Sequence, residues 1–251
     1  MSTAPVPERT DYEVRIPTEI TNAAGYFKSV SEVIARLPFQ TINLMADTLV
    51  QAYLDNRAVL LFGNGGSAAL ASHLACDLGK GTIVDGTRRF RVLSLADNVP
   101  LITAWANDSQ YENIFAEQLL NIVQPNDVAL AISGSGNSPN VLNGLRAARQ
   151  GGAATLGLTG YQGGKMKSLC DICVVVPSDN MQHIEDLHLS ITHAIFTGLR
   201  YRIREIAAQK PRPVGALEQL ALARPHLQFD QLTEALTGKM SAQMTSGDSQ
   251  K

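Results

Sequence analysis

Two short loops rich in glycine and hydroxyl groups are the first residues in this chain that could do chemistry. Residues 63–68 are Gly-Asn-Gly-Gly-Ser-Ala, and residues 133–138 are Ser-Gly-Ser-Gly-Asn-Ser. Each follows a short apolar run and precedes a helical pattern, so each should join a strand to a helix. Glycines let backbone N–H groups approach a bound anion, and a helix N-terminus adds partial positive charge. The two loops therefore predict the binding of a phosphate group.

The first loop alone allows two other interpretations. Gly63, Gly65 and Ala68 fit the G-x-G-x-x-A pattern of dinucleotide-binding proteins, and Asp85 follows at a suitable distance, although residues 82–86 make a poor second strand for that fold. A tight turn without a ligand also fits. The second loop favours one phosphate held from several sides, and neither loop has the lysine of a P-loop. We therefore expect a small phosphorylated metabolite and no nucleotide cofactor.

Imidazole and carboxylate side chains form a second candidate group. His73 and Asp77 lie four residues apart on the helix that the first loop opens, so they share a face. Glu185 and His193 lie eight residues apart on a long helix nearer the C-terminus and roughly share a face as well. Together they could bind Zn²⁺ or a similar ion, or serve as general acid and base. A solvated surface pair is the alternative for His73 and Asp77.

The elements that must position these groups alternate along the chain. Apolar runs predict strands at 58–62, 91–95, 127–133, 154–160 and 171–177. Periodic patterns predict helices at 68–78, 111–123, 138–150 and 181–204, and two more between residues 21 and 56. This alternation predicts one parallel sheet covered on both faces, with ligands at the carboxyl ends of the strands. We expect a flexible arm over 1–20, one domain over 21–205 with an N-terminal helical hairpin, and an extension over 206–251 that is partly helical and then disordered.

Composition narrows the class of protein. The 251 residues carry a formal charge of −2 and 45% hydrophobic residues, which favours a globular core and excludes the basic surface of a nucleic-acid binder. No apolar run is long enough to span a membrane, and no signal peptide is recognisable. Three cysteines favour a reducing compartment, so we expect a cytoplasmic protein. Cys170 and Cys173 have redox spacing, but we favour burial over chemistry for both.

The motifs in combination resemble the sugar isomerase (SIS) domain family. They are Gly-Asn-Gly-Gly-Ser followed by His73, the loop at 133–138, Leu-Thr-Gly-Tyr-x-Gly-Gly-Lys-Met at 158–166, and Ile-Glu-Asp-Leu-His with a later histidine at 184–193. They are most similar to its phosphoheptose isomerase branch. The resemblance implies a three-layer α/β/α sandwich with a five-stranded parallel sheet of flavodoxin-like order, assembled as a homotetramer. It also implies zinc, and conversion of sedoheptulose 7-phosphate to D-glycero-D-manno-heptose 7-phosphate.

Carried over by position, the resemblance assigns roles to individual residues. Asp77 and His193 would be the catalytic acid/base pair, and the metal ligands would be His73, Asp77, Glu185 and His193. The substrate-binding set would be Asn64, Gly65, Gly66, Ser67, Asp108, Ser133, Gly134, Ser135, Asn137, Ser138 and Glu185.

Four residues depart from the pattern of that branch. Asp77 stands where the branch has glutamate, and Glu185 where it has glutamine. Gly134 stands where it has threonine, and Gln182 where it has aspartate. These changes keep two alternatives open. One is an isomerase of a different phosphosugar. The other is a non-catalytic SIS module that binds a sugar phosphate or a protein, like the replication-initiation regulator DiaA, which lacks the second histidine that His193 provides here.

Overall fold

The computed structural model of this chain describes residues 22–209. The chain divides into two units, residues 1–204 and 205–251, and the sheet, the loops and the candidate site all belong to the first. The predicted arm over 1–20 and nearly all of the predicted extension over 206–251 lie outside the described residues. The three-part division of the chain therefore stays a prediction. Within the described residues, no helix is long and apolar enough to cross a membrane.

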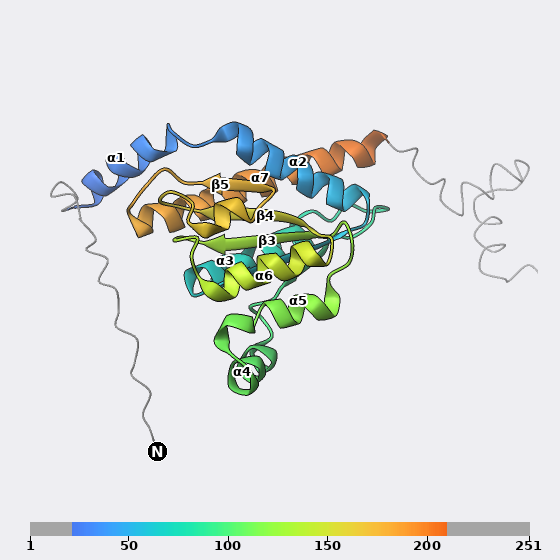
Figure 1. The fold of residues 1–251 in the computed structure, drawn as a ribbon. Helices are drawn as coiled ribbons and strands as arrows, with labels where there is room; N and C mark the ends of the chain where they lie inside the picture. Colours follow the sequence, from blue (N-terminus) through green and yellow to red (C-terminus); the bar gives the residue numbers. More distant parts are fainter. Residues whose placement is uncertain (1–21, 210–251) are drawn as a thin grey trace, which may run out of the picture. The chain divides into compact units, whose positions relative to one another are not determined.

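A five-stranded parallel sheet forms the centre of the fold (Figure 1). Its strands are β1 (Ala58–Gly63), β2 (Arg91–Ser94), β3 (Val128–Ser133), β4 (Ala154–Thr159) and β5 (Ile172–Val175). Their spatial order is β2-β1-β3-β4-β5, which is the flavodoxin-like order. The predicted α/β sandwich is confirmed, and each strand lies within two residues of its predicted position. β1 and β3 are neighbours at the centre, with Gly63 paired to Ile132.

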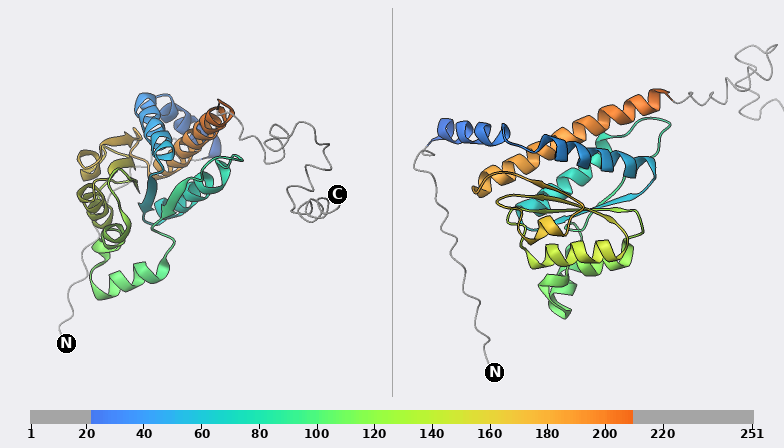
Figure 2. Two further views of the ribbon diagram at one scale, coloured as in Figure 1. Left: turned by 90° about the vertical axis from the view of Figure 1, so that its right-hand side faces the viewer. Right: turned by 45° about the horizontal axis from the view of Figure 1, so that its top comes forward.

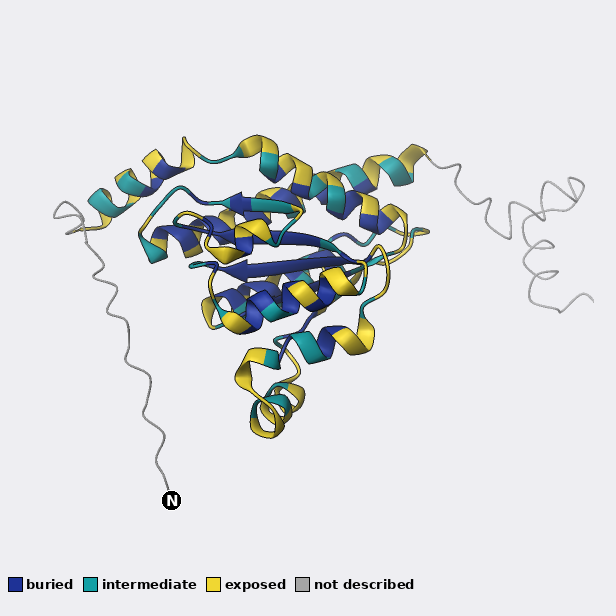
Figure 3. Ribbon diagram, viewed as in Figure 1, coloured by how far each residue is buried: buried dark blue, intermediate teal, exposed yellow. Residues whose placement is uncertain are grey.

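Helices cover both faces because side chains alternate along each strand. Leu60 and Phe62 of β1 join a buried apolar cluster with α5 (Ala116–Ile122) and α6 (Pro139–Gln150). The opposite face is covered by α2 (Phe39–Leu54), α3 (Gly66–Cys76) and α7 (Met181–Gln209), as the two views of Figure 2 show. The three inner strands β1, β3 and β4 are almost wholly buried between these layers, whereas the edge strands β2 and β5 are partly exposed (Figure 3). Such burial explains why the strand sequences are continuous apolar runs.

Two helices precede the sheet, as the periodicity predicted. α1 (Ala23–Ile34) begins at Asn22, whose side chain accepts a hydrogen bond from the backbone N–H of Gly25. α2 packs against β1 and β5. α1 buries only Val30 and Val33.

The segment after β2 differs from the sequence prediction. A helix over 111–123 was expected, but the chain forms α4 (Val99–Asp108), a single 3₁₀ turn at Tyr111–Asn113, and then α5. α4 has no fully buried residue, and its short apolar stripe of Ile102, Trp105 and Ala106 packs against the core only partly buried. Its start did carry a signal: the side chain of Asn98 accepts from the N–H of Leu101, and Pro100 occupies the first turn.

α3 changes its winding at the candidate carboxylate. The predicted helix over 68–78 is α3 followed by a π-helical turn at Asp77–Gly81. Gly81 is required there, because a Cβ atom would lie 2.4 Å from the Phe196 ring of α7. Such wide turns redirect side chains and often occur at functional sites. Here the turn begins at Asp77.

Candidate functional site

The first loop needs its glycines for close backbone approach. A Cβ atom on Gly63 would lie 2.6 Å from the carbonyl oxygen of Ile132 on β3. Gly65 has φ +56°, a conformation that other residues rarely adopt, and α3 begins immediately after it. Ser67 is buried in the first turn of α3, and its backbone N–H donates to the Asn64 carbonyl at 3.0 Å. The backbone N–H of Gly66 and the hydroxyl group of Ser67 make no hydrogen bond within residues 22–209. The loop thus offers donors at a helix N-terminus, as predicted.

The second loop lies at the end of the neighbouring strand. Gly136 has φ +64°, and a Cβ atom there would lie 2.3 Å from the carbonyl oxygen of Gly163. Ser138 is the N-cap residue of α6, yet its side chain makes no capping hydrogen bond there. The Ser133 and Ser135 hydroxyls accept only long bonds, of 3.2 and 3.3 Å, from backbone N–H groups of the same loop. These hydroxyl groups are therefore able to turn to a ligand.

Two other residues of the second loop have structural contacts. The side-chain amide of Asn137 donates to the Ser135 carbonyl and accepts from the backbone N–H of Lys165 at 3.0 Å. A Cβ atom on Gly134 would lie 2.5 Å from the sulfur of Met181. The packing of Met181 thus explains why this chain has no threonine at position 134.

The side chains of Asn64 and Asn140 join the two loops. Each amide donates to the carbonyl oxygen of the other, and both bonds are 2.8 Å long. The hydroxyl of Tyr111 donates to the same Asn64 oxygen at 3.1 Å. Neither Asn140 nor Tyr111 was predicted from the sequence. Asn140 could have been suspected from its place two residues beyond Ser138, whereas no signal in the sequence marks Tyr111.

His73, Asp77 and His193 come together between α3 and α7. The two Nε2 atoms lie 2.9 Å apart, and an oxygen of Asp77 lies 3.4 Å from Nε2 of His73 and 3.9 Å from that of His193. One ligand atom from each of the three residues can be chosen so that all lie within 4.8 Å of one another. Asp77 thus reaches both histidines although it is one methylene shorter than the expected glutamate.

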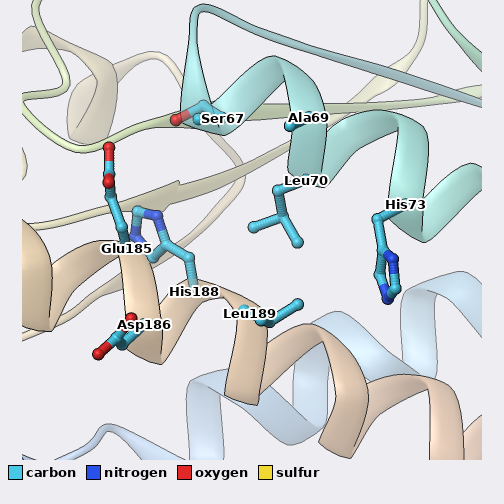
Figure 4. A pocket seen from close by; sticks show the side chains of 9 residues that line it. Ser67, Ala69, Leu70, His73, Glu185, Asp186, His188 and Leu189 are labelled. Atoms are coloured by element: carbon cyan, nitrogen blue, oxygen red, sulfur yellow. The ribbon is translucent and has the colours of Figure 1, made fainter.

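Glu185, the fourth predicted ligand, lies beside the first loop instead of in this cluster. A Cβ atom on Gly66 would lie 3.2 Å from a carboxylate oxygen of Glu185, so the carboxylate lies close to this loop. A cavity of about 330 Å³ runs between α3 and α7 (Figure 4). Ser67 and Glu185 lie at one end of it, and His73 lies at the other. The cavity therefore connects the first loop to the histidine cluster.

Asp108, which was expected to contact the sugar, has its one side-chain hydrogen bond within the described residues to a neighbouring residue of α4. It is the exposed last residue of α4, and its carboxylate accepts from the side chain of Asn107 at 2.7 Å. Within residues 22–209 it makes no hydrogen bond to either loop.

His188 is a buried residue of the cavity wall that the sequence analysis did not assign. Its side chain is 1% exposed, and its Nε2 atom has no hydrogen-bond partner in the described part of the chain. Burial lowers the pKa of His188 to about 4, although a hydrogen bond with the Thr159 backbone opposes this effect. The imidazole is therefore neutral at pH 7.

None of the three cysteines belongs to the cluster of His73, Asp77 and His193. Cys170 and Cys173 are partly buried and hydrogen-bonded to each other, and both the hydrogen bond and burial raise the pKa of Cys170. This placement agrees with the expected burial of the pair. Cys76 is an exposed free thiol beside Asp77.

Comparison with known proteins gives a consistent result. The family model of the SIS domain matches residues 25–160. A phosphoheptose isomerase from Pelobacter propionicus is 38% identical over 177 residues, which are 70% of this chain and 93% of that protein. A phosphoheptose isomerase from Aquifex aeolicus is 37% identical over 172 residues, which are 67% of this chain and 90% of that protein. The solved phosphoheptose isomerase of Francisella tularensis superposes with a TM-score of 0.66 at 28% identity, covering 71% of this chain and 96% of that one.

Proposed function

Since this chain belongs to the SIS domain family and, within it, to the phosphoheptose isomerases, we propose that it converts sedoheptulose 7-phosphate to D-glycero-D-manno-heptose 7-phosphate. The observation that carries the proposal is the single cavity that connects Ser67 to His73. A phosphosugar needs one end of a site to hold its phosphate and another to exchange protons near its carbonyl. The cavity offers both.

The loops would supply binding and orientation. Backbone N–H groups at the start of α3, with the hydroxyls of Ser67, Ser133, Ser135 and Ser138, would hold the phosphate. Fixing the phosphate would place the open-chain sugar along the cavity and supply part of the rate enhancement as positioning. Asn64, three residues before Ser67 in the first loop, would contribute a further N–H donor.

Asp77 and His193 would move the protons. The Asp77 carboxylate would remove the proton from the carbon next to the carbonyl and return it to the neighbouring carbon, through an enediol. His193 would donate a proton to the carbonyl oxygen and take one from the adjacent hydroxyl. Both groups belong to the cluster at the His73 end of the cavity. General acid–base catalysis by such a pair contributes about 10²–10⁴-fold in rate.

The cluster would also hold a divalent metal ion, for which we propose zinc. Two imidazole nitrogens and one carboxylate oxygen form a donor set that zinc accepts in catalytic sites. His73, Asp77 and His193 would be its ligands, with Glu185 as the fourth only if its side chain swings away from Gly66. The ion would polarise the carbonyl of the bound sugar.

We also propose that the protein forms a homotetramer. Phe27, Phe39 and Leu44 on α1 and α2 are more than half exposed. Apolar surface of this kind is typical of an interface. Light scattering of the full chain would give the mass of the assembly, and a monomer at micromolar concentration would contradict the proposal.

Turnover of sedoheptulose 7-phosphate by the purified protein tests the function. The reaction would be followed by ³¹P NMR with added Zn²⁺ and again with a chelator. Metal-dependent formation of the heptose phosphate would support both the reaction and the metal site. A folded protein that binds the sugar phosphate without forming product would point to another phosphosugar or to a binding role.

A further inference from the structure

The paired amides of Asn64 and Asn140 have one defined orientation. Asn140 lies in the first turn of α6 and is 2% exposed. Its side-chain oxygen accepts from the backbone N–H of Val141 at 3.0 Å. A backbone N–H can only donate, so this atom of Asn140 must be the oxygen. Its nitrogen is therefore the atom that donates to Asn64, and the Asn64 atom that accepts this bond must be oxygen. The Asn140 oxygen in turn accepts from the Asn64 nitrogen.

In this orientation Asn64 can offer a ligand only a hydrogen-bond donor. Its oxygen already accepts from Asn140 and from the hydroxyl of Tyr111. Its nitrogen donates one hydrogen to Asn140, and the second hydrogen has no partner within the described residues. Asn64 is only partly buried, so this hydrogen is available. Asn64 can donate to an oxygen of a bound molecule but cannot accept from one.

The pair also connects the two loops that hold the serines. Asn64 lies three residues before Ser67, and Asn140 lies two residues after Ser138. Between residues 63–67 and residues 133–140 as the structure describes them, these two bonds are the only ones that side chains make. A phosphate held from both sides requires the loops to keep a defined separation, to within about 0.5 Å.

From this geometry we infer that Asn140 is a positioning residue, which holds Asn64 as a hydrogen-bond donor to a phosphate oxygen and keeps the two serine loops together. The inference rests on the proposed function for the identity of the ligand class, a phosphate monoester. Asn140 itself is buried beneath the loops and acts through Asn64. Tyr111 secures the same Asn64 oxygen from the other side.

Two substitutions of Asn140 test the inference, with inorganic phosphate as the probe. Asn140→Ser keeps an acceptor for the Val141 N–H and removes both bonds to Asn64, while Asn140→Ala removes all three. Gln118→Ala is the matched control: Gln118 is also a buried amide, 4% exposed, and it donates to the carbonyl oxygens of Leu95 and Ile114, outside both loops. Each variant would be studied by calorimetry with phosphate, thermal unfolding and steady-state kinetics.

Both Asn140 variants should raise the Kd for phosphate and the KM for sedoheptulose 7-phosphate by about tenfold, with a smaller effect on kcat. Asn64→Ala should have a similar effect, and the Asn64→Ala/Asn140→Ala double variant should be little worse than either single variant. Gln118→Ala should lower the thermal stability without changing the Kd. In NMR spectra, phosphate should shift the side-chain amide signals of Asn64 in the wild type and not in Asn140→Ser.

Three results would overturn the inference. They are a folded Asn140→Ser variant with wild-type phosphate affinity, additive effects in the double variant, and a Kd that rises equally in Gln118→Ala. The probe also separates this inference from the proposed function. A wild-type protein that binds phosphate but does not isomerise the sugar contradicts the function alone, because the Kd comparison among variants still applies. Wild-type protein without phosphate affinity contradicts both.

Discussion

Replacing the buried His188 by asparagine should remove a defined part of the acid sensitivity of the fold. The imidazole is 1% exposed, and burial lowers its pKa from 6.5 to about 4, against the opposing hydrogen bond with the Thr159 backbone. Between those two pH values the unfolded chain binds a proton at this histidine and the native state does not. The free energy of unfolding must therefore fall as the pH falls from 6.5 to 4.

The size of this effect follows from the same two pKa values. Their difference corresponds to about 3 kcal/mol, because a tenfold change in a protonation equilibrium is 1.36 kcal/mol. Most of that loss, about 2–3 kcal/mol, should be present at pH 4.5. Asparagine offers an amide N–H that can replace the imidazole N–H as a donor and does not titrate. On acidification to pH 4.5, the free energy of unfolding of His188→Asn should therefore fall by about 2–3 kcal/mol less than that of the wild type.

Urea unfolding followed by circular dichroism, at pH 7.5 and at pH 4.5, measures the difference. Carboxylates titrate in both proteins, so the comparison is between the two losses and not between the two stabilities. The substitution also lowers the free energy of unfolding through lost packing. This loss is the same at both pH values, so it does not affect the change between pH 7.5 and pH 4.5. Equal acid losses in the two proteins would refute the reasoning, because His188 would then accept a proton in the folded state as easily as in the unfolded chain.

Three further predictions concern the proposed site and its loops. Asp77→Asn should lower turnover of sedoheptulose 7-phosphate at least about 100-fold while phosphate affinity, measured by calorimetry, stays nearly unchanged; wild-type turnover would exclude the carboxylate as the base. Glu185→Gln should tighten phosphate binding roughly threefold, since it removes a negative charge beside Gly66; unchanged affinity would place the phosphate elsewhere. Gly136→Ala should cost about 2 kcal/mol or more in urea unfolding, given its φ of +64° and the nearby Gly163 carbonyl; a variant of wild-type stability would contradict this packing.

The sheet could be predicted because its residues carry their own signal. The strand at 58–62 is a continuous apolar run that ends in a glycine loop, and it is buried on both faces in the structure. The helix predicted at 181–204 is present as α7, and its apolar residues at three- and four-residue spacing, such as Ile184, Leu187 and Ile191, are buried. The missed helix α4 has no fully buried residue, and its apolar stripe of Ile102, Trp105 and Ala106 is short, so its signal in the sequence is weak.

The candidate site was only partly predictable, because spacing along a helix does not determine what lies opposite. His73 and Asp77 were expected to share a face, and they do. Glu185 and His193 also lie on one helix, but eight residues separate them by about 12 Å along its axis. Their side chains therefore reach opposite ends of the cavity. The contacts of Asn140 with Asn64 depend on the approach of two loops from separate strands, and no local pattern encodes that approach.

Because Gly63 of β1 pairs with Ile132 of β3, phosphate binding depends on the correct register of these two strands. Both serine loops extend from adjacent central strands, so a slip of one residue between β1 and β3 would displace one loop from the other by about 3.3 Å. A collapsed molecule with such a slip would keep its helices and its circular dichroism spectrum, but it would not bind phosphate. The stoichiometry of inorganic phosphate binding would therefore give the fraction of molecules with the correct strand register in a refolded preparation. Circular dichroism would not separate these molecules from other compact ones.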